Sequence, residues 1–120
     1  MKKILVTGGA GYIGSVLVRK LLMKGYHVKV LDILNFGGDS LIEVFDNPNF
    51  EFVKGDVRKV SDVLVAITDA DYVVNLAAIV GDPACVQNPE LAKETNFEGT
   101  KLLYEVSNAK NVRKFIFAST

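Results

Sequence analysis

Three regularly spaced glycines near the amino terminus mark a place where bare backbone could meet a charged ligand. Gly8, Gly11 and Gly14 follow the apolar run at residues 4–6 in a G-x-x-G-x-x-G pattern. Such glycines allow a sharp turn with positive φ, let backbone approach a pyrophosphate, and let a helix pack closely on a strand. The N–H groups that open the following helix then provide an anion site without a basic side chain. The pattern predicts a dinucleotide-binding turn, with a glycine turn that holds no ligand as the alternative.

One acidic residue strengthens this interpretation. Asp32 ends the apolar segment at residues 28–31, about 20 residues after the glycines, where such a motif expects an acid. A carboxylate there can accept hydrogen bonds from both hydroxyls of the adenosine ribose, whereas a 2′-phosphate would meet like charge. Residues 33–35 include no Arg or Lys that could receive that phosphate. NAD is therefore predicted rather than NADP. A helix cap or a solvated loop acid is the alternative for Asp32.

Further polar and small residues follow the later apolar segments. Asp56 ends the third segment on the side where the adenine should lie, and an ordinary turn aspartate is an equally supported alternative. Leu76, Ala77 and Ala78 end the fourth, where small side chains let a ribose and pyrophosphate approach, or simply allow close packing. Asn96 lies within a long helical pattern, where asparagine is a poor helix former. It is either a surface residue or a brace for the loop beneath the nicotinamide.

Composition excludes several classes of protein. The chain has 120 residues, 49% apolar residues and a formal net charge of zero, so it is long enough for one domain with its own core and carries no sign of disorder, nucleic-acid binding or membrane-surface binding. The apolar run behind Lys2 and Lys3 is too short for a signal peptide or a membrane span, and cytoplasmic residence is the expectation. With one cysteine, Cys85, and one histidine, His27, neither an internal disulfide nor a Cys/His metal cluster can form.

Short apolar runs alternate with helical patterns along the whole chain, which indicates βαβ units and a parallel sheet. We expect strands at residues 3–7, 26–32, 50–54, 71–76 and 113–118, and helices at residues 12–24, 41–45, 61–67 and 89–108. Right-handed crossovers then give the strand order 3-2-1-4-5, an α/β doubly wound sheet. Its switch point lies between strands one and four, so a ligand should lie across the carboxyl ends of those strands.

Apolar spacing and turn residues predict how the helices face and where they begin and end. The residues expected to share an inward face are Ile13, Val16, Leu17 and Leu21 in the first helix, Val60, Val63, Leu64 and Ile67 in the third, and Leu91, Thr95, Leu102, Leu103 and Val106 in the longest. Gly25 should end the first helix. Asp39 or Ser40 should cap the short one, and Pro89 should open the last.

Six motifs together resemble one family. They are residues 7–15, Asp32, residues 55–58, residues 75–78, residues 96–100 and residues 115–120. In their order and spacing they look like the extended short-chain dehydrogenase/reductase superfamily, whose fold is of the Rossmann type. Within it, the chain most resembles the NAD-dependent epimerase/dehydratase family, which acts on nucleotide sugars. The match covers the whole chain and is more specific than any single motif.

The resemblance implies a role for each matching residue. Gly8, Gly11, Tyr12, Ile13 and Gly14 would hold the pyrophosphate of NAD, Asp32 the adenosine ribose, and Asp56 and Val57 the adenine; Leu76, Ala77 and Ala78 would line the ribose and nicotinamide path, and Asn96 would brace that loop. Thr120 matches the family's Ser/Thr after the fifth strand, whose hydroxyl hydrogen-bonds the reacting sugar oxygen. It is the one catalytic residue that the resemblance implies here.

The chain also departs from the family's pattern. Family enzymes use a Tyr-x-x-x-Lys pair for acid/base catalysis, but the residues four positions after the tyrosines are Val16, Val30, Leu76 and Asn108. Residues 79–81 lack the lysine that some galactose epimerases carry. We therefore expect residues 1–120 to be the NAD-binding part of a longer enzyme, ending before the sixth strand and the nucleotide-sugar domain. This part should bind cofactor without turnover, and should self-associate through its exposed edge strand or its long helix.

Two other functions are compatible with parts of the pattern. A non-catalytic NAD(P)-binding regulator of the atypical short-chain dehydrogenase type would share the turn, although such proteins more often have fewer or shifted glycines. A Rossmann methyltransferase would also use an acid such as Asp32, but the glycine spacing and the ending at residues 115–120 do not match that class.

Overall fold

The computed structural model describes residues 2–33, 39–76 and 89–117; within the last range, side chains are described at residue 90 and over residues 99–116. In chain order, the elements are β1 (Lys3–Thr7), α1 (Tyr12–Met23), β2 (His27–Asp32), the 3-10 helix η1 (Asp39–Val44), β3 (Phe50–Lys54), α2 (Val60–Ile67), β4 (Tyr72–Asn75), α4 (Pro89–Ala109) and β5 (Lys114–Phe117). Strands alternate with helices, as the apolar pattern predicts.

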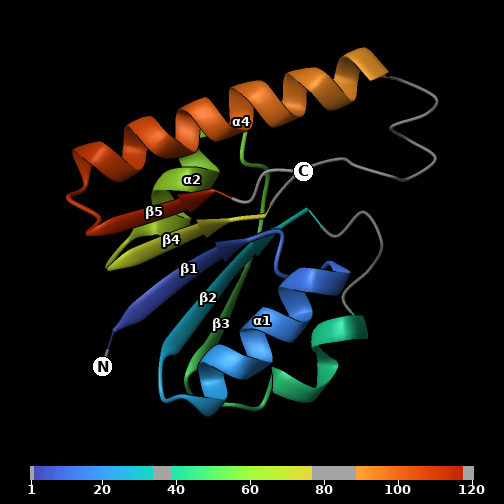
Figure 1. Cartoon of the computed structure of the whole chain (residues 1–120), viewed down its shortest axis with the longest axis vertical. Helices are drawn as coiled ribbons and strands as arrows, with labels where there is room; N and C mark the ends of the chain where they lie inside the picture. The colour runs from blue at the N-terminus through green and yellow to red at the C-terminus, as the bar shows by residue number, and fades with distance from the viewer. Residues whose placement is uncertain (1, 34–38, 77–88, 118–120) are drawn as a thin grey trace.

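The strands form one parallel sheet in the order β3-β2-β1-β4-β5. This confirms the predicted α/β doubly wound architecture of the Rossmann type. In the central register, Thr7 of β1 lies opposite Leu31 of β2 on one side and Asn75 of β4 on the other. The carboxyl ends of β1, β2 and β4 therefore lie next to one another, with the switch point between β1 and β4 (Figure 1).

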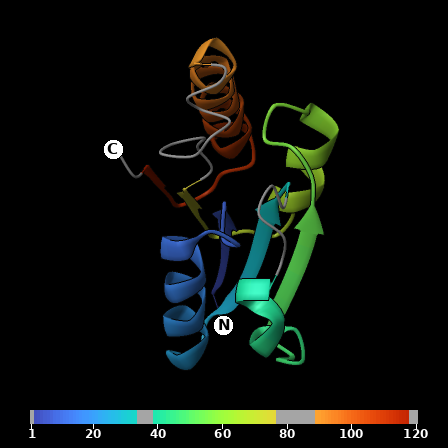
Figure 2. The ribbon, with the colours of Figure 1, turned by 90° about the vertical axis from the view of Figure 1, so that its right-hand side faces the viewer.

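Helices cover both faces of the sheet. α1 and η1 lie on one face, and α2 and α4 lie on the other (Figures 1 and 2). The two faces give two buried clusters. The cluster beneath α1 includes Val6, Val18 and Val30, and the cluster beneath α2 and α4 includes Leu5 and Leu103. Successive strand residues alternate between the two clusters because side chains along a strand point to opposite faces.

The inward face predicted for α1 is partly wrong. Leu21 packs against the buried cluster and Leu17 is half-buried, but Ile13 is 70% exposed and Val16 is 40% exposed, whereas Gly14, Val18 and Leu22 are buried. The reason is the close packing of Gly14 on the preceding turn, which directs positions 14, 18 and 22 toward the sheet and turns positions 13 and 16 outward. Apolar residues lie on both the buried and the exposed sides of α1, so their spacing alone does not identify the inward face.

The face predicted for α2 is partly wrong. Val63 and Ile67 are buried as expected, but Val60 is 53% exposed and Leu64 is 40% exposed, and Ala66 is buried in their place. In a helix of 8 residues, a stripe of small and branched side chains suffices to cover the strands below.

The short helix differs from expectation in its bounds. It is a 3-10 helix over Asp39–Val44, where a short helix was expected at residues 41–45 with Asp39 or Ser40 as its cap. Ser40 does not cap it, because its hydroxyl donates instead to the main-chain oxygen of Ala10, at 2.6 Å.

Helix ends elsewhere follow the predicted signals. Gly25 has φ +92°, the N–H of Gly25 bonds to Leu22 and the N–H of Tyr26 bonds to Leu21, which together form a Schellman motif. Pro89 opens α4 as predicted. Of its predicted inward residues, Leu103 is buried and Leu102 and Val106 pack beside it. Within the described ranges, no helix combines the length and apolarity that crossing a bilayer requires.

Candidate functional site

The glycine-rich turn joins β1 to α1 at the carboxyl edge of the sheet. Gly8 has φ +78°, a conformation that glycine adopts without steric cost. Its N–H donates to the main-chain oxygen of Leu31 at 2.8 Å, which continues the pairing with β2, and its own oxygen accepts from the N–H of Gly11 at 3.2 Å. The chain therefore reverses tightly within four residues, and α1 begins directly after Gly11.

Two glycines of this turn are required by packing. A Cβ atom built on Gly14 would collide with the main-chain oxygen of Gly8 and lie 2.7 Å from the Cα atom of Gly9. A Cβ atom on Gly9 would lie 2.7 Å from a methyl group of Val30. By contrast, the nearest atom to a Cβ on Gly11 is the oxygen of Gly8 at 3.4 Å, an ordinary contact. Packing thus accounts for Gly9 and Gly14 but not for Gly11.

The start of α1 has no side-chain cap. Gly11 is its N-cap and provides no side-chain hydrogen bond, so the first-turn N–H groups have no partner within the helix. The side chains of Tyr12 and Ile13 are 87% and 70% exposed, so neither is buried in the turn. N–H groups that the helix itself does not pair, at the positive end of a 12-residue helix, are suited to a phosphate oxygen.

Asp32 lies beside this turn, at the carboxyl end of β2. Its Oδ2 atom accepts a hydrogen bond from the N–H of Ala10 at 3.0 Å. One carboxylate oxygen of Asp32 is therefore bound to the glycine turn itself, and its part in binding a ribose stays a prediction. A carboxylate in this place borders both the turn and the edge of the sheet where an adenosine ribose would lie.

Asp56 and Val57 are held by their own neighbours. The carboxylate of Asp56 accepts hydrogen bonds from Arg58, including one from Nη2 and one from the main-chain N–H, each at 2.8 Å. These bonds hold the pKa of Asp56 below its ordinary value although partial burial opposes them. The N–H of Asp56 donates to Asp62 at 2.9 Å. Val57 is 7% exposed and contacts Gly99 of α4. This geometry matches a structural turn, and a part in adenine binding stays a prediction.

The remaining predicted site residues are described in part or not at all. The N–H of Leu76 donates to the oxygen of Thr7 at 2.9 Å, and its side chain packs against the cluster beneath α1. Asn96 lies in α4, and its side chain is outside the described part of the structure. Ala77, Ala78 and Thr120 lie outside the described residues. The turn, Asp32 and the end of β4 are thus brought together, as the topology predicts.

Two buried side-chain hydrogen bonds beside the switch point were not predicted from the sequence. The hydroxyl of Thr7 donates to Oδ1 of Asn75 at 2.6 Å, and Nδ2 of Asn75 donates to the hydroxyl of Thr100 at 3.1 Å. Thr7 and Asn75 are fully or almost fully buried. The bonds tie β1, β4 and α4 together beneath the predicted nicotinamide end. A polar residue ending each of two apolar strands is the signal that could have revealed it.

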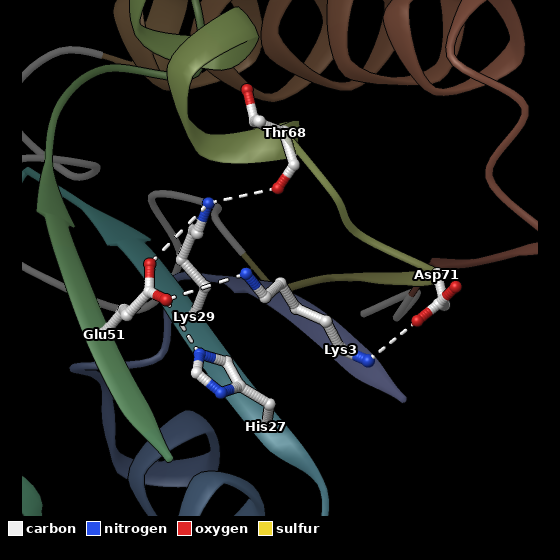
Figure 3. A network of polar contacts seen from close by, with 6 residues as sticks. All are labelled: Lys3, His27, Lys29, Glu51, Thr68 and Asp71. Atoms are coloured by element: carbon white, nitrogen blue, oxygen red, sulfur yellow. Dashed lines mark hydrogen bonds and ion pairs between the residues drawn. The ribbon is translucent and has the colours of Figure 1, made fainter. Parts of the chain in front are cut away.

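A second polar cluster lies at the opposite, amino-terminal end of the strands. Glu51 of β3 accepts a hydrogen bond from His27 at 2.8 Å and faces Lys3 and Lys29 at 3.6 and 3.8 Å (Figure 3). Burial raises the pKa of Glu51, but the hydrogen bond and the nearby positive charges outweigh it and lower that pKa overall. Among the described residues, no three His, Cys, Asp or Glu side chains gather in a way that could hold a metal ion.

Comparison with known proteins identifies a family. Residues 4–120 match the family described as "NAD dependent epimerase/dehydratase family". The bifunctional UDP-glucose 4-epimerase and UDP-xylose 4-epimerase 1 of Pisum sativum is 35% identical over 131 residues, which cover 99% of this chain and 37% of that protein.

Two solved structures are similar in fold and sequence. The UDP-glucose 4-epimerase of Thermus thermophilus in complex with NAD has a TM-score of 0.85 and 35% identity, covering 98% of this chain and 37% of that one. The dTDP-glucose 4,6-dehydratase of Bacillus anthracis in complex with NAD has a TM-score of 0.84 and 32% identity, covering 100% of this chain and 38% of that one. The present chain therefore spans well under half the length of these relatives.

Proposed function

This chain belongs to the NAD dependent epimerase/dehydratase family, and from that premise we propose that it forms the NAD-binding part of a nucleotide-sugar epimerase or dehydratase. The observation that carries the proposal is the start of α1 without a side-chain cap, beside Asp32, together with the room for a side chain that position 11 leaves unused. The relatives supply the substrate class, because their names specify UDP- and dTDP-linked sugars.

The residues of the turn fit the two halves of an adenosine diphosphate group. The first-turn N–H groups of Tyr12, Ile13 and Gly14 would donate to the diphosphate, and Gly11 would let that group approach the backbone. Asp32 would accept from the ribose hydroxyls and disfavour a 2′-phosphate, which selects NAD over NADP. When bound, NAD supplies reversible hydride acceptance from a sugar carbon.

The sugar chemistry belongs to the longer protein. We propose that Thr120 hydrogen-bonds the reacting sugar oxygen, that Ala77 and Ala78 line the path of the ribose and nicotinamide, and that Asn96 braces their loop. Acid/base catalysis needs a group within hydrogen-bond reach of the transferred proton, and no tyrosine in residues 1–120 is followed four positions later by lysine. We therefore expect this 120-residue chain to bind NAD without turning over a nucleotide sugar.

Calorimetric titration of the 120-residue chain tests the proposal. We expect NAD and ADP to bind, NADP to bind at least tenfold more weakly than NAD, and S-adenosylmethionine not to bind. Asp32→Asn should narrow the gap between NAD and NADP, since it removes the negative charge and keeps the side chain's shape. Absence of NAD binding by wild type would overturn the proposal, and steady conversion of UDP-glucose would overturn the expected lack of turnover.

We also propose that the isolated chain self-associates. β5 lies at the edge of the sheet, where backbone groups can pair with another chain, and Ile116 on β5 and Tyr104 on α4 are each about half exposed, at 51% and 52%. The partner we propose is a second copy. Sedimentation velocity over a range of concentrations should show a dimer that Ile116→Lys weakens, and a monomer at every concentration would contradict this.

A further inference from the structure

Ala10, in the middle of the glycine turn, has both of its main-chain polar groups bound by side chains from outside the turn. Its N–H donates to Asp32 at 3.0 Å, and its oxygen accepts from the hydroxyl of Ser40 at 2.6 Å. Asp32, the acceptor, ends β2, and Ser40, the donor, lies in the first turn of η1. Ala10 itself is only 9% exposed, so solvent does not easily replace either bond.

These bonds fix two successive peptide planes. The plane between Gly9 and Ala10 is held through the N–H that Asp32 accepts. The plane between Ala10 and Gly11 is held at its oxygen by Ser40 and at its N–H by Gly8. Gly11 is the N-cap of α1, so the second plane sets the direction in which the helix and its first N–H groups begin.

Arg19 of α1 holds Ser40 in place. Its Nη2 atom donates to the main-chain oxygen of Ser40 at 2.9 Å and lies 3.6 Å from the carboxylate of Glu43. Its Nε atom is buried and has no hydrogen-bond partner among the residues that the structure describes, which normally costs free energy. The contacts with Ser40 and Glu43 of η1 therefore determine where the guanidinium lies, even though that position leaves one of its N–H donors without a partner among the described residues.

We propose that Ser40 and Arg19 are positioning residues of the cofactor site, acting through Ala10 on the diphosphate-binding turn and on Asp32. The proposal rests on the function proposed above and adds two residues that would touch no part of NAD. Ser40 fixes the orientation of the peptide plane between Ala10 and Gly11, and Arg19 holds the main chain of Ser40 in place. A turn held in its binding conformation before the ligand arrives loses less entropy on binding.

Removal of the Ser40 hydroxyl tests this. We expect Ser40→Ala to raise the Kd for NAD and for ADP about five- to tenfold, the scale of one hydrogen bond, and Ser40→Thr to restore both because it keeps the hydroxyl. Arg19→Met should have a smaller effect in the same direction. Since both bonds meet at Ala10, Ser40→Ala and Asp32→Asn should be non-additive in NAD binding.

Ser107 provides a matched control. Its hydroxyl also donates to a main-chain oxygen, that of Leu103 at 2.7 Å, and it is buried in α4. Ser107→Ala should leave the Kd for NAD within twofold of wild type. Equal Kd values for wild type and Ser40→Ala, or equal changes in Ser40→Ala and Ser107→Ala, would overturn the positioning role. Failure of the wild type to bind NAD would instead overturn the proposed function. If Ser40→Ala does not fold, Ser40→Thr and Arg19→Met still decide the outcome.

Discussion

The ammonium group of Lys29 lies beneath the end of α2, where its Nζ atom donates a hydrogen bond to the main-chain oxygen of Thr68 at 3.2 Å (Figure 3). Lys29 is 6% exposed. Desolvation lowers its pKa, and the attraction of Glu51 opposes that shift without cancelling it. A buried cation thus binds the carbonyl end of a helix, where positive charge is favourable, at a cost in hydration.

The first prediction is that losing Glu51 harms the fold more than losing Lys29. Glu51→Gln leaves Lys29 buried without its carboxylate and should lower the free energy of unfolding by about 1 kcal/mol or more. Lys29→Met removes the buried charge and should remain within about 1 kcal/mol of wild type. Urea unfolding at neutral pH measures both. Glu43→Gln is the control, because the ion pair of Glu43 with Arg19 is solvent-exposed. It should change the free energy of unfolding by less than about 0.5 kcal/mol.

The second prediction concerns alkaline pH. Because the folded pKa of Lys29 is lowered, the unfolded chain binds more protons between that pKa and the ordinary lysine value of about 10.4, so stability should rise with pH in that window. Lys29→Met removes this contribution. The stability of wild type relative to Lys29→Met should therefore increase from pH 8 toward about pH 10. A difference that shrinks instead would show that the pKa is not lowered.

The third prediction concerns acid. The bonds from Arg58 lower the pKa of Asp56, so their stabilising effect should be complete above the ordinary aspartate pKa of about 3.9 and be lost as the pH falls through the lower folded value. Arg58→Met should cost on the order of 1 kcal/mol or less at pH 7. The gap between wild type and variant should close in unfolding experiments below about pH 3. A gap that is constant with pH would contradict the pairing.

The fourth prediction separates two glycines of the turn. Gly14→Ala should destabilise the fold by about 2 kcal/mol or more, because its methyl group would collide with Gly8 and Gly9. Gly11→Ala should cost only a few tenths of a kcal/mol beyond the loss of a good N-cap residue, yet should weaken NAD binding. Thermal unfolding and NAD titration of the two variants measure this. Equal losses of stability would refute the distinction.

The fifth prediction concerns the two buried side-chain hydrogen bonds at the switch point. Asn75→Leu leaves the hydroxyls of Thr7 and Thr100 without the amide between them and should cost about 1–3 kcal/mol. Asn108→Leu, at an exposed position of α4, serves as the control and should be nearly neutral. Denaturant unfolding measures the change in the free energy of unfolding for each variant. Similar changes for the two would mean that the hydrogen bonds of Asn75 contribute nothing to stability.

Much of the fold could be predicted because the strands are covered on both faces. The segments at residues 3–7 and 50–54 agree with β1 and β3 residue for residue. Residues 4–6 of β1 form a continuous apolar run, as expected of a strand covered on both faces, and the edge strand β3 is bounded by turn residues on both sides. The strand order followed from the handedness of the crossovers. The helix faces were harder. Ile13 and Val16 are apolar at helical spacing and yet exposed, because the contact at Gly14 sets the rotation of α1.

The candidate site was predictable in its backbone and not in its side-chain bonds. Glycine spacing indicated the turn, and Asp32 lies where its spacing placed it. Either Asp39 or Ser40 was expected to cap a helix, a local role, but the hydroxyl of Ser40 bonds to Ala10, which is 30 residues away in sequence. A single sequence does not reveal which of several local and distant acceptors a serine hydroxyl will choose, since the choice depends on tertiary packing.

The different neighbours of Gly9, Gly11 and Gly14 carry an evolutionary consequence. Folding alone constrains Gly9 and Gly14, because any side chain there would strike the protein itself. Gly11 has room for one, so folding constrains that position only through its place as the N-cap of α1, and the proposed dinucleotide would be the stronger reason to keep it bare. A descendant that abandoned its nucleotide while retaining this architecture should therefore drift first at position 11, and should preserve the other two long after its chemistry was gone.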